Sequence, residues 1–422
     1  MSKTVIKNGL VIDGNGGEAK KGQIVVINGS KIEYVGDASG YQPSGNEKIV
    51  DADGGTILPG LIDTHVHMMM EYTPVSKKLE TPFSLMYYEA EKHLNSTLQA
   101  GITSVRDAAG TDLGVKQAVE KGLISGPRLQ LSINALTITG GHGDGYTVSG
   151  NVIENLPSNY PGMPNGICDG VEEVRKKVRE ILRAGADVIK VHATGGVLSA
   201  TDHPEFTQFS PEELKVIVDE GAYRKGVKVM AHAQGSEGIK NAIKAGIHSI
   251  EHGIYLDDEA IELMLEHGTY LVPTLLAPVS VLETADEVGM PDTAVAKSKE
   301  VIEAHKESFT KAYKAGVKIA MGTDAGVMKH GTNLRELGLM AEGGMSPMDT
   351  IVASTKTAAE CLGWEDQLGT LEQGKIADLI VVKGNPLDDI DALANNDTVQ
   401  LVMKDGKLEK NLLIKEKSLL VN

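Results

Sequence analysis

Short apolar runs alternate with amphipathic, helix-like segments through the middle of the chain, from Thr56 to about Gly363. This alternation is typical of a parallel sheet covered by helices, in which each strand is followed by a helix. About eight runs have the character of strands, and they lie at residues 56–67, 102–108, 128–135, 187–193, 228–233, 249–253, 270–275 and 318–324. Because eight parallel strands can close on themselves, the pattern predicts an α/β fold built on a (β/α)8 TIM-like barrel.

The two ends of the chain follow a different pattern, of short alternating strands joined by tight turns. Asn28-Gly29 separates two such runs near the amino end, and Asp405-Gly406 separates two near the carboxyl end. Both dipeptides favour the turn of a β-hairpin. We therefore predict that the two ends meet in one small β-sandwich domain, into which the barrel is inserted. The predicted boundaries are 1–57 plus 366–422 for the sandwich and 58–365 for the barrel.

Charge and hydropathy limit the partners that this chain can have. The formal net charge is −17 and no basic patch is visible, which argues against a nucleic-acid partner. No apolar run approaches the roughly 18 residues of a membrane span, and the amino end lacks the apolar core of a signal peptide. The predicted location is therefore the cytoplasm. Cys168 and Cys361 form no disulfide framework and no C-x-x-C motif, so both are expected to be ordinary thiols.

The stretch LPGLIDTHVH, Leu58 to His67, carries the first candidate metal ligands. Alternate residues of a strand point to the same face, so His65 and His67 emerge together and can hold one metal ion. An isolated H-x-H pair is equally compatible with two histidines satisfied by hydrogen bonds in a core or on a surface. The remaining sequence must therefore supply the other ligands.

Further ionisable residues stand in, or directly after, the later apolar strands. Barrel interiors are normally filled by branched apolar side chains, and buried charges cost several kcal/mol each unless they share a partner. A divalent metal is the simplest common partner for imidazole nitrogens and carboxylate oxygens. The set consists of His65, His67, Lys190, His232, His252 and Asp324.

These residues, in this order, resemble the amidohydrolase superfamily. The phrases LPGLIDTHVH (58–67) and GTLEQGKIADLIVV (369–382) are similar to the boundary signatures of that family, and the likeness spans nearly the whole chain. The resemblance implies a metal-dependent hydrolase of C–N bonds, and it implies that the barrel associates into a homo-oligomer. It also implies two divalent ions, with zinc expected first, although sites made of nitrogen and oxygen ligands accept several metals.

The resemblance further assigns a role to each candidate ligand. Lys190 would be carboxylated on its ε-nitrogen, so that a carbamate bridges the two ions. His65, His67 and Asp324 would hold the more buried ion, and His232 and His252 the other. In such a site the ions lower the pKa of a water and polarise the substrate carbonyl. Asp324 would be the catalytic residue, acting first as general base and then as general acid.

Longer phrases resemble one branch of the family, the imidazolonepropionase-like group with its metal-dependent prolidases, carboxypeptidases and ochratoxin-hydrolysing amidases. They are IKVHATGGV (189–197), AYRKGVKVMAHAQG (222–235), SIEHG (249–253) and MGTDAG (321–326). This branch implies a small-molecule substrate: a dipeptide, an N-acyl amino acid or an ochratoxin-type amide with a free carboxylate. His142, in the loop TGGHGDG, and Tyr223 are the predicted substrate contacts.

Three alternatives stay open from the sequence. One is hydrolysis of a cyclic amide such as imidazolonepropionate, another is a single-metal deaminase of the same fold, and the third is a scaffold without activity. The roles of some residues are also open. His192 lies on the same predicted strand face as Lys190 and could support a ligand, compete for metal or line the pocket. His203 is left unassigned, and Arg106-Asp107 could be a structural ion pair or part of the site.

Overall fold

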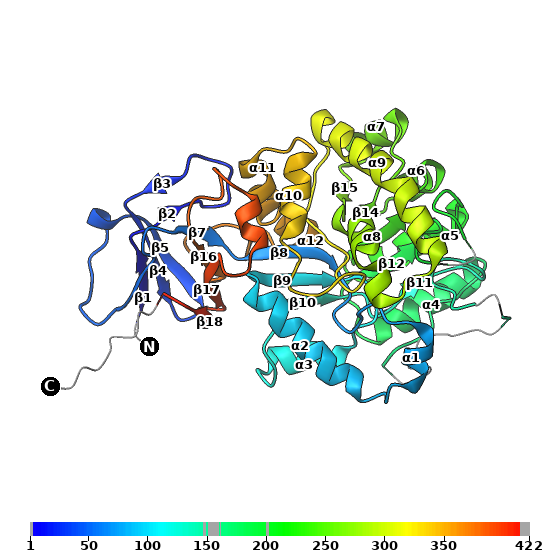
Figure 1. Ribbon diagram of the computed structural model, residues 1–422, viewed down its shortest axis with the longest axis horizontal. Helices are drawn as coiled ribbons and strands as arrows, with labels where there is room; N and C mark the ends of the chain where they lie inside the picture. Colours follow the sequence, from blue (N-terminus) through cyan, green and yellow to red (C-terminus); the bar gives the residue numbers. More distant parts are fainter. Residues whose placement is uncertain (1–2, 147–148, 151–159, 161, 200–201, 414–422) are drawn as a thin grey trace.

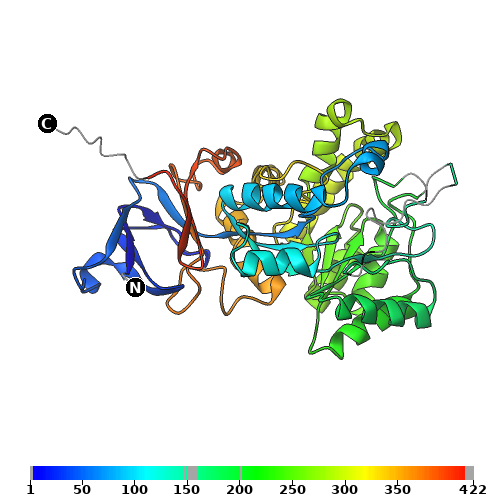
Figure 2. The same cartoon turned by 90° about the horizontal axis from the view of Figure 1, so that it is seen from below.

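The computed structural model describes residues 3–146, 149–150, 160, 162–199 and 202–413. Figure 1 shows the strands of the two chain ends gathered at one end of the molecule, and the parallel strands with their helices at the other. The view from below in Figure 2 shows the same separation. The predicted α/β composition is confirmed. Within the described ranges, no helix combines the length and the apolar character needed to cross a membrane.

The chain ends form two sheets, one built from the amino end alone and the other from strands of both ends. The first sheet has the order β5 (Lys31–Asp37), β4 (Gln23–Asn28), β1 (Thr4–Lys7), β6 (Lys48–Asp51). The second has the order β18 (Lys407–Asn411), β17 (Val399–Lys404), β16 (Leu379–Val382), β7 (Thr56–Pro59), β2 (Leu10–Val11), β3 (Lys20–Lys21). Strand β16 runs antiparallel to β7, with Leu379 opposite Pro59. One cluster of buried apolar side chains joins the two sheets and includes Ile6, Val25 and Leu401.

The middle of the chain contains two parallel sheets. One has the order β10 (Arg128–Leu131), β9 (Ile102–Asp107), β8 (Leu61–Val66). The other has the order β11 (Ala135–Leu136), β12 (Ile189–His192), β13 (Val229–Ala233), β14 (Ser249–His252), β15 (Tyr270–Val272). Their apolar side chains and those of the surrounding helices form the largest core of the molecule.

These sheets are linked by backbone hydrogen bonds, but the described strands do not form one closed sheet. The predicted strand at 128–135 is divided into β10 and β11, because Ile133 adopts a left-handed backbone with φ 67°. The predicted strand at 318–324 forms no regular ladder. It nevertheless lies between β15 and β8: Leu271 N donates to Lys318 O at 2.9 Å, and Thr64 N donates to Met321 O at 2.9 Å.

Helices connect the parallel strands and cover them. One helix begins with a capping box, which Ser210 and Glu213 form around Pro211 at the first helical position. The α-helices are α1 (Val75–Glu80), α2 (Leu85–Gln99), α3 (Leu113–Glu120), α4 (Val171–Arg183), α5 (Pro211–Ala222), α6 (Ser236–Ala245), α7 (Asp258–His267), α8 (Leu276–Val288), α9 (Asp292–Ala315), α10 (Arg335–Glu342), α11 (Pro347–Ala353) and α12 (Lys356–Leu362). Two short 3-10 helices lie at η1 (Ala38–Gly40) and η2 (Asp391–Ala394).

Candidate metal centre

The structure brings all the predicted metal ligands to the carboxyl ends of the parallel strands. Strands β8, β12, β13 and β14 each contribute a residue at or near their last position, and His67 directly follows β8. Asp324 follows the run at 318–323, and its backbone N–H donates to His65 O at 2.8 Å. The residues taken from within the strands are His65, Lys190, His232 and His252, and all four are buried.

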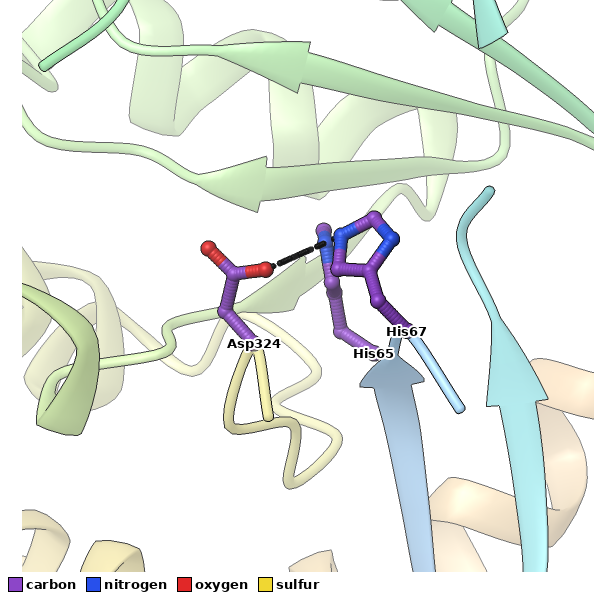
Figure 3. A group of neighbouring side chains, drawn as sticks. All are labelled: His65, His67 and Asp324. Carbon is purple, nitrogen blue, oxygen red and sulfur yellow. Dashed lines mark ion pairs between the residues drawn. The ribbon is translucent and has the colours of Figure 1, made fainter. Parts of the chain in front are cut away.

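One group of donor atoms is close enough to hold a single ion. His67 Nε2 lies 3.1 Å from Asp324 Oδ1, and His65 Nε2 lies 3.5 Å from the same oxygen. The three side chains offer ligand atoms that all lie within 4.8 Å of one another. Figure 3 shows the two imidazoles rising from the end of β8 toward the carboxylate on the neighbouring loop. Two nitrogens and one oxygen in this arrangement suit a divalent transition metal such as zinc.

The other predicted ligands continue from this group as an arc of imidazoles. The ring centroids of His65 and His252 lie 5.1 Å apart, and those of His252 and His232 lie 4.6 Å apart. Lys190 Nζ lies 3.4 Å from His65 Nε2. Within the described part of the chain, no carboxylate oxygen lies within 4.0 Å of Lys190 Nζ. A buried ammonium without an anionic partner is costly, which sets Lys190 apart from an ordinary structural lysine.

Each of the four imidazoles is held by the protein through one ring nitrogen. When one nitrogen of a neutral imidazole donates a hydrogen bond, the lone pair of the other is left for a metal. In His65, His67 and His252 the nitrogen that remains for a metal is Nε2, and in His232 it is Nδ1. The bonds are His65 Nδ1 to Glu251 Oε2 at 2.7 Å, His67 Nδ1 to Ala109 O at 2.9 Å, His252 Nδ1 to Thr274 Oγ1 at 2.7 Å and His232 Nε2 to Gly195 O at 2.9 Å. The donor set therefore fits metal binding.

The electrostatic environment favours the metal-binding form of His65, His232 and His252, whereas for His67 burial is outweighed by the hydrogen bond and the charge of Asp324, which raise the pKa. Burial is the largest cause that holds the pKa of His65, His232 and His252 well below the usual value, and the nearby Lys190 charge acts in the same direction. Low pKa values keep the imidazoles neutral, with a lone pair available. For Asp324, burial opposes ionisation, but the hydrogen bond from His67 and the charges of His67 and Lys190 leave the pKa below its usual value.

Two ligands stand on strained backbone. His252 has φ 75° and Asp324 has φ 65°, and Thr274, the partner of His252, has φ 52°. Non-glycine residues adopt left-handed backbone at a cost and do so preferentially at functional sites. The left-handed backbone turns the side chains of His252 and Asp324 toward the edge of the sheet where the other candidate ligands lie.

Glu251 is a functional residue that the sequence did not reveal. It is fully buried on β14 and accepts hydrogen bonds from His65 Nδ1 at 2.7 Å, Arg106 Nη2 at 2.9 Å and Ser249 Oγ at 2.6 Å. Arg106 therefore pairs with Glu251 rather than with Asp107. The only signal in the sequence was an acidic residue inside an apolar strand, directly before His252.

The predicted substrate contact His142 also lies at this centre. Its ring stacks on His232 with centroids 4.3 Å apart and an interplanar angle of 20°. Its Nδ1 lies 2.9 Å from Ser199 Oγ and 3.5 Å from Asp202 Oδ2. His203 lies outside the centre, where its Nε2 is 3.6 Å from Glu300 Oε1.

Tyr223, the other predicted substrate contact, is not brought to the centre, and this interpretation is corrected. Tyr223 is the C-cap of α5, and its side chain is 74% exposed. The helix runs back along the sheet, so Tyr223 precedes the amino end of β13, whereas His232 lies near the carboxyl end of that strand. The prediction rested on the family resemblance, but Tyr223 and His232 belong to opposite ends of β13.

Comparison with known proteins agrees with this geometry. The model of the amidohydrolase family matches residues 56–408. The ochratoxinase of Aspergillus niger is 38% identical over 96% of this chain and 86% of its own length. The crystal structure of a Xaa-Pro dipeptidase with methionine bound in the active site has a TM-score of 0.86 and 38% identity, covering 96% of this chain and 99% of that one. A prolidase complexed with N-methylphosphonate-L-proline has a TM-score of 0.91 and 38% identity, covering 97% and 100%.

Proposed function

The chain belongs to the amidohydrolase family, and we propose that it cleaves the amide bond of dipeptides or N-acyl amino acids that carry a free carboxylate. The observation that carries the proposal is the arc of four imidazoles, each held through one ring nitrogen beside Asp324 and Lys190. The similar dipeptidase, prolidase and ochratoxinase support this substrate class. Ochratoxin-type amides belong to the same class of candidates.

The proposed enzyme is a (β/α)8 barrel of residues 58–365 with a small β-sandwich domain of residues 1–57 and 366–422. Backbone hydrogen bonds that link Leu271 and Thr64 to the run at 318–324 support an eight-stranded barrel. The pairing of β16 with β7 and the apolar cluster between the two terminal sheets support the sandwich. This division places every proposed metal ligand in the barrel.

We propose two divalent ions, with zinc expected first. His65, His67 and Asp324 would hold one ion, His232 and His252 the other, and Lys190 would lie between them. The fit of Lys190 depends on carboxylation: the ammonium would lose a proton, and the neutral amine would then add carbon dioxide and release a second proton. A buried cation that no described carboxylate contacts would thus be replaced by an anion with two oxygens. When bound, such ions polarise a carbonyl and lower the pKa of a water.

Asp324 is the proposed catalytic residue. Its Oδ1 faces His65 and His67, whereas its Oδ2 accepts no hydrogen bond from the described residues. The carboxylate can therefore take a proton from the attacking water and deliver it to the nitrogen that leaves. His142, stacked on His232, is proposed to contact the substrate beyond the amide bond.

The proposal is tested with a panel of dipeptides and N-acyl amino acids, assayed with zinc, manganese and cobalt added separately. We expect these substrates to exceed their carboxyl-amidated analogues in kcat/KM by about a hundredfold or more, because a site built for a polar group rejects analogues that lack it. Two ions per chain and a carbamate on Lys190 would accompany activity. Preferred turnover of cyclic amides, or a deaminase with a single ion, would contradict the proposal.

Replacing Tyr223 by alanine should change KM by less than about twofold, because exposed side chains away from a site contribute little. The matched variant His142→Ala should raise KM about tenfold or more through loss of a contact to the substrate. Initial rates over a range of substrate concentrations measure both effects. A large rise in KM for the Tyr223 variant alone would show that this residue does reach the substrate.

A further inference from the structure

His192 is a partly buried imidazole beside the candidate metal centre, and no described residue forms a hydrogen bond with its ring. It ends β12, two residues after Lys190, and lies opposite His232 in the register of β12 and β13. Its Nδ1 is fully enclosed and has no partner, and neither ring nitrogen bonds to any residue in the described ranges. The five other histidines of the centre, including His142, all have such a bond. Nε2 is not enclosed in this way, so it is the ring nitrogen that is open to a partner from outside the chain.

The surrounding loops leave space for this imidazole and for His142. A Cβ added to Gly143 would lie 2.9 Å from the His192 ring, and a Cβ added to Gly196 would overlap the ring of His142. The two rings meet edge to face, with centroids 5.1 Å apart and an interplanar angle of 87°. Because Nδ1 of His192 is enclosed against Gly143, Nε2 is the nitrogen that a ligand can reach.

The charges around the pair select the kind of ligand. Asp202 is the only carboxylate of the described residues within 4.0 Å of either imidazole, and it is already engaged by Ser199 and by Gln208 at 3.3 Å. The other ionisable neighbours of His192 are His142, His232, Lys190 and His67, which carry no negative charge. An N–H donor in such surroundings suits an anionic acceptor oxygen.

A third metal ion at this position fits less well. Among the residues that the structure describes, only His65, His67 and Asp324 offer three such donors within 4.8 Å of one another. The rings of His192 and His232 lie edge to face, with centroids 5.3 Å apart. His192 itself belongs to no described group of three such donors.

We propose that His192 is a specificity-determining residue, whose Nε2–H donates a hydrogen bond to the free carboxylate of the substrate beside His142. The inference rests on the proposed function and deepens it. Asp324 lies at one end of the arc of imidazoles and the His142–His192 pair at the other. A substrate whose amide bond lies between these ends would present its carboxylate to His192. Tyr223 precedes the opposite, amino end of β13, so it is not placed to bind that carboxylate.

The test is calorimetric titration of the zinc-loaded full chain with product-like amino acids. The probes are L-proline, L-methionine and L-phenylalanine, each compared with the amino alcohol that lacks the carboxylate. Wild-type protein should bind at least one amino acid more tightly than its alcohol. His192→Ala should weaken that binding about tenfold or more and leave the alcohol within about twofold, because the lost hydrogen bond is made to a charge.

Two further variants separate specificity from structure. His192→Asn keeps an N–H donor and should retain part of the preference, and His203→Ala, in the loop after β12, should retain all of it. Equal weakening of acid and alcohol, no preference in the wild type, or loss of zinc from His192→Ala would overturn the inference. Failure of the wild type to cleave any N-acyl amino acid would remove the proposed function, whereas a carboxylate preference that depends on His192 would still support the subsite.

Discussion

Asp324→Asn should lower kcat by about a thousandfold or more while the protein remains folded. Asparagine has nearly the same size and keeps one oxygen toward His67, which now lies 3.1 Å from the carboxylate. It cannot accept a proton from water, so the steps that depend on general base and general acid are lost together. The measurement is kcat with the best substrate of the panel, together with the metal content and the thermal unfolding temperature of the variant.

Asp388→Asn is the matched control, because Asp388 is exposed and lies in the segment that follows β16. The control should keep full activity. An Asp324→Asn protein that keeps a tenth or more of the wild-type kcat with normal metal content would rule out Asp324 as the base. If the variant loses its metal, its activity is measured again at saturating zinc. That measurement separates the role of Asp324 as a metal ligand from its role in proton transfer.

The clustering of the candidate metal ligands could be predicted from the sequence because it follows from strand order. Parallel strands present their carboxyl ends at one edge, so polar residues that end successive apolar runs must lie close together. His232 and His252 are examples: each ends a short apolar run, and their rings lie 4.6 Å apart in the structure. The family resemblance was needed to give Lys190 its role, since a lone lysine in a strand carries no such signal.

The backbone conformation of one residue and the direction of one helix explain two features that the sequence did not predict. The run at 128–135 reads as one strand, but the left-handed backbone of Ile133 divides it, and no propensity rule indicates that conformation for isoleucine. Tyr223 was predicted from the family resemblance, but the end of the sheet at which it lies depends on the direction of its helix, α5. Both errors concern a choice that tertiary packing makes.

Glu251 was missed for a related reason. Neighbouring residues of a strand point to opposite faces, so the assignment of His252 as a ligand drew attention away from the residue before it. The role of Glu251 depends on His65 and Arg106, which lie 186 and 145 residues away in the chain. A contact of this kind appears only when the strands are assembled.

Glu251→Gln should weaken zinc binding by about tenfold to a hundredfold, the usual effect of losing a carboxylate that orients a metal-bound histidine. Glu251 accepts from both His65 Nδ1 and Arg106 Nη2, whereas an amide has only one acceptor oxygen for the two donors. With its orienting bond weakened, His65 would present Nε2 to the metal less often. Competition with a chromophoric chelator measures the affinity, and the absorption spectrum of the cobalt-loaded variant reports the ligand geometry.

Arg106→Met separates this positioning role from a general loss of stability. Arg106 is fully buried, and its removal leaves the Glu251 charge without its cationic partner, which should lower the free energy of unfolding by about 3 kcal/mol or more. The bond from His65 Nδ1 to Glu251 would remain, so zinc affinity should fall by less than about threefold at a temperature where the variant is folded. Glu251→Gln should lose stability as well, but its loss of affinity should be several times larger. Equal losses of affinity in the two variants would contradict a specific role for the Glu251 carboxylate, because both would then reflect only the disturbed core around Arg106.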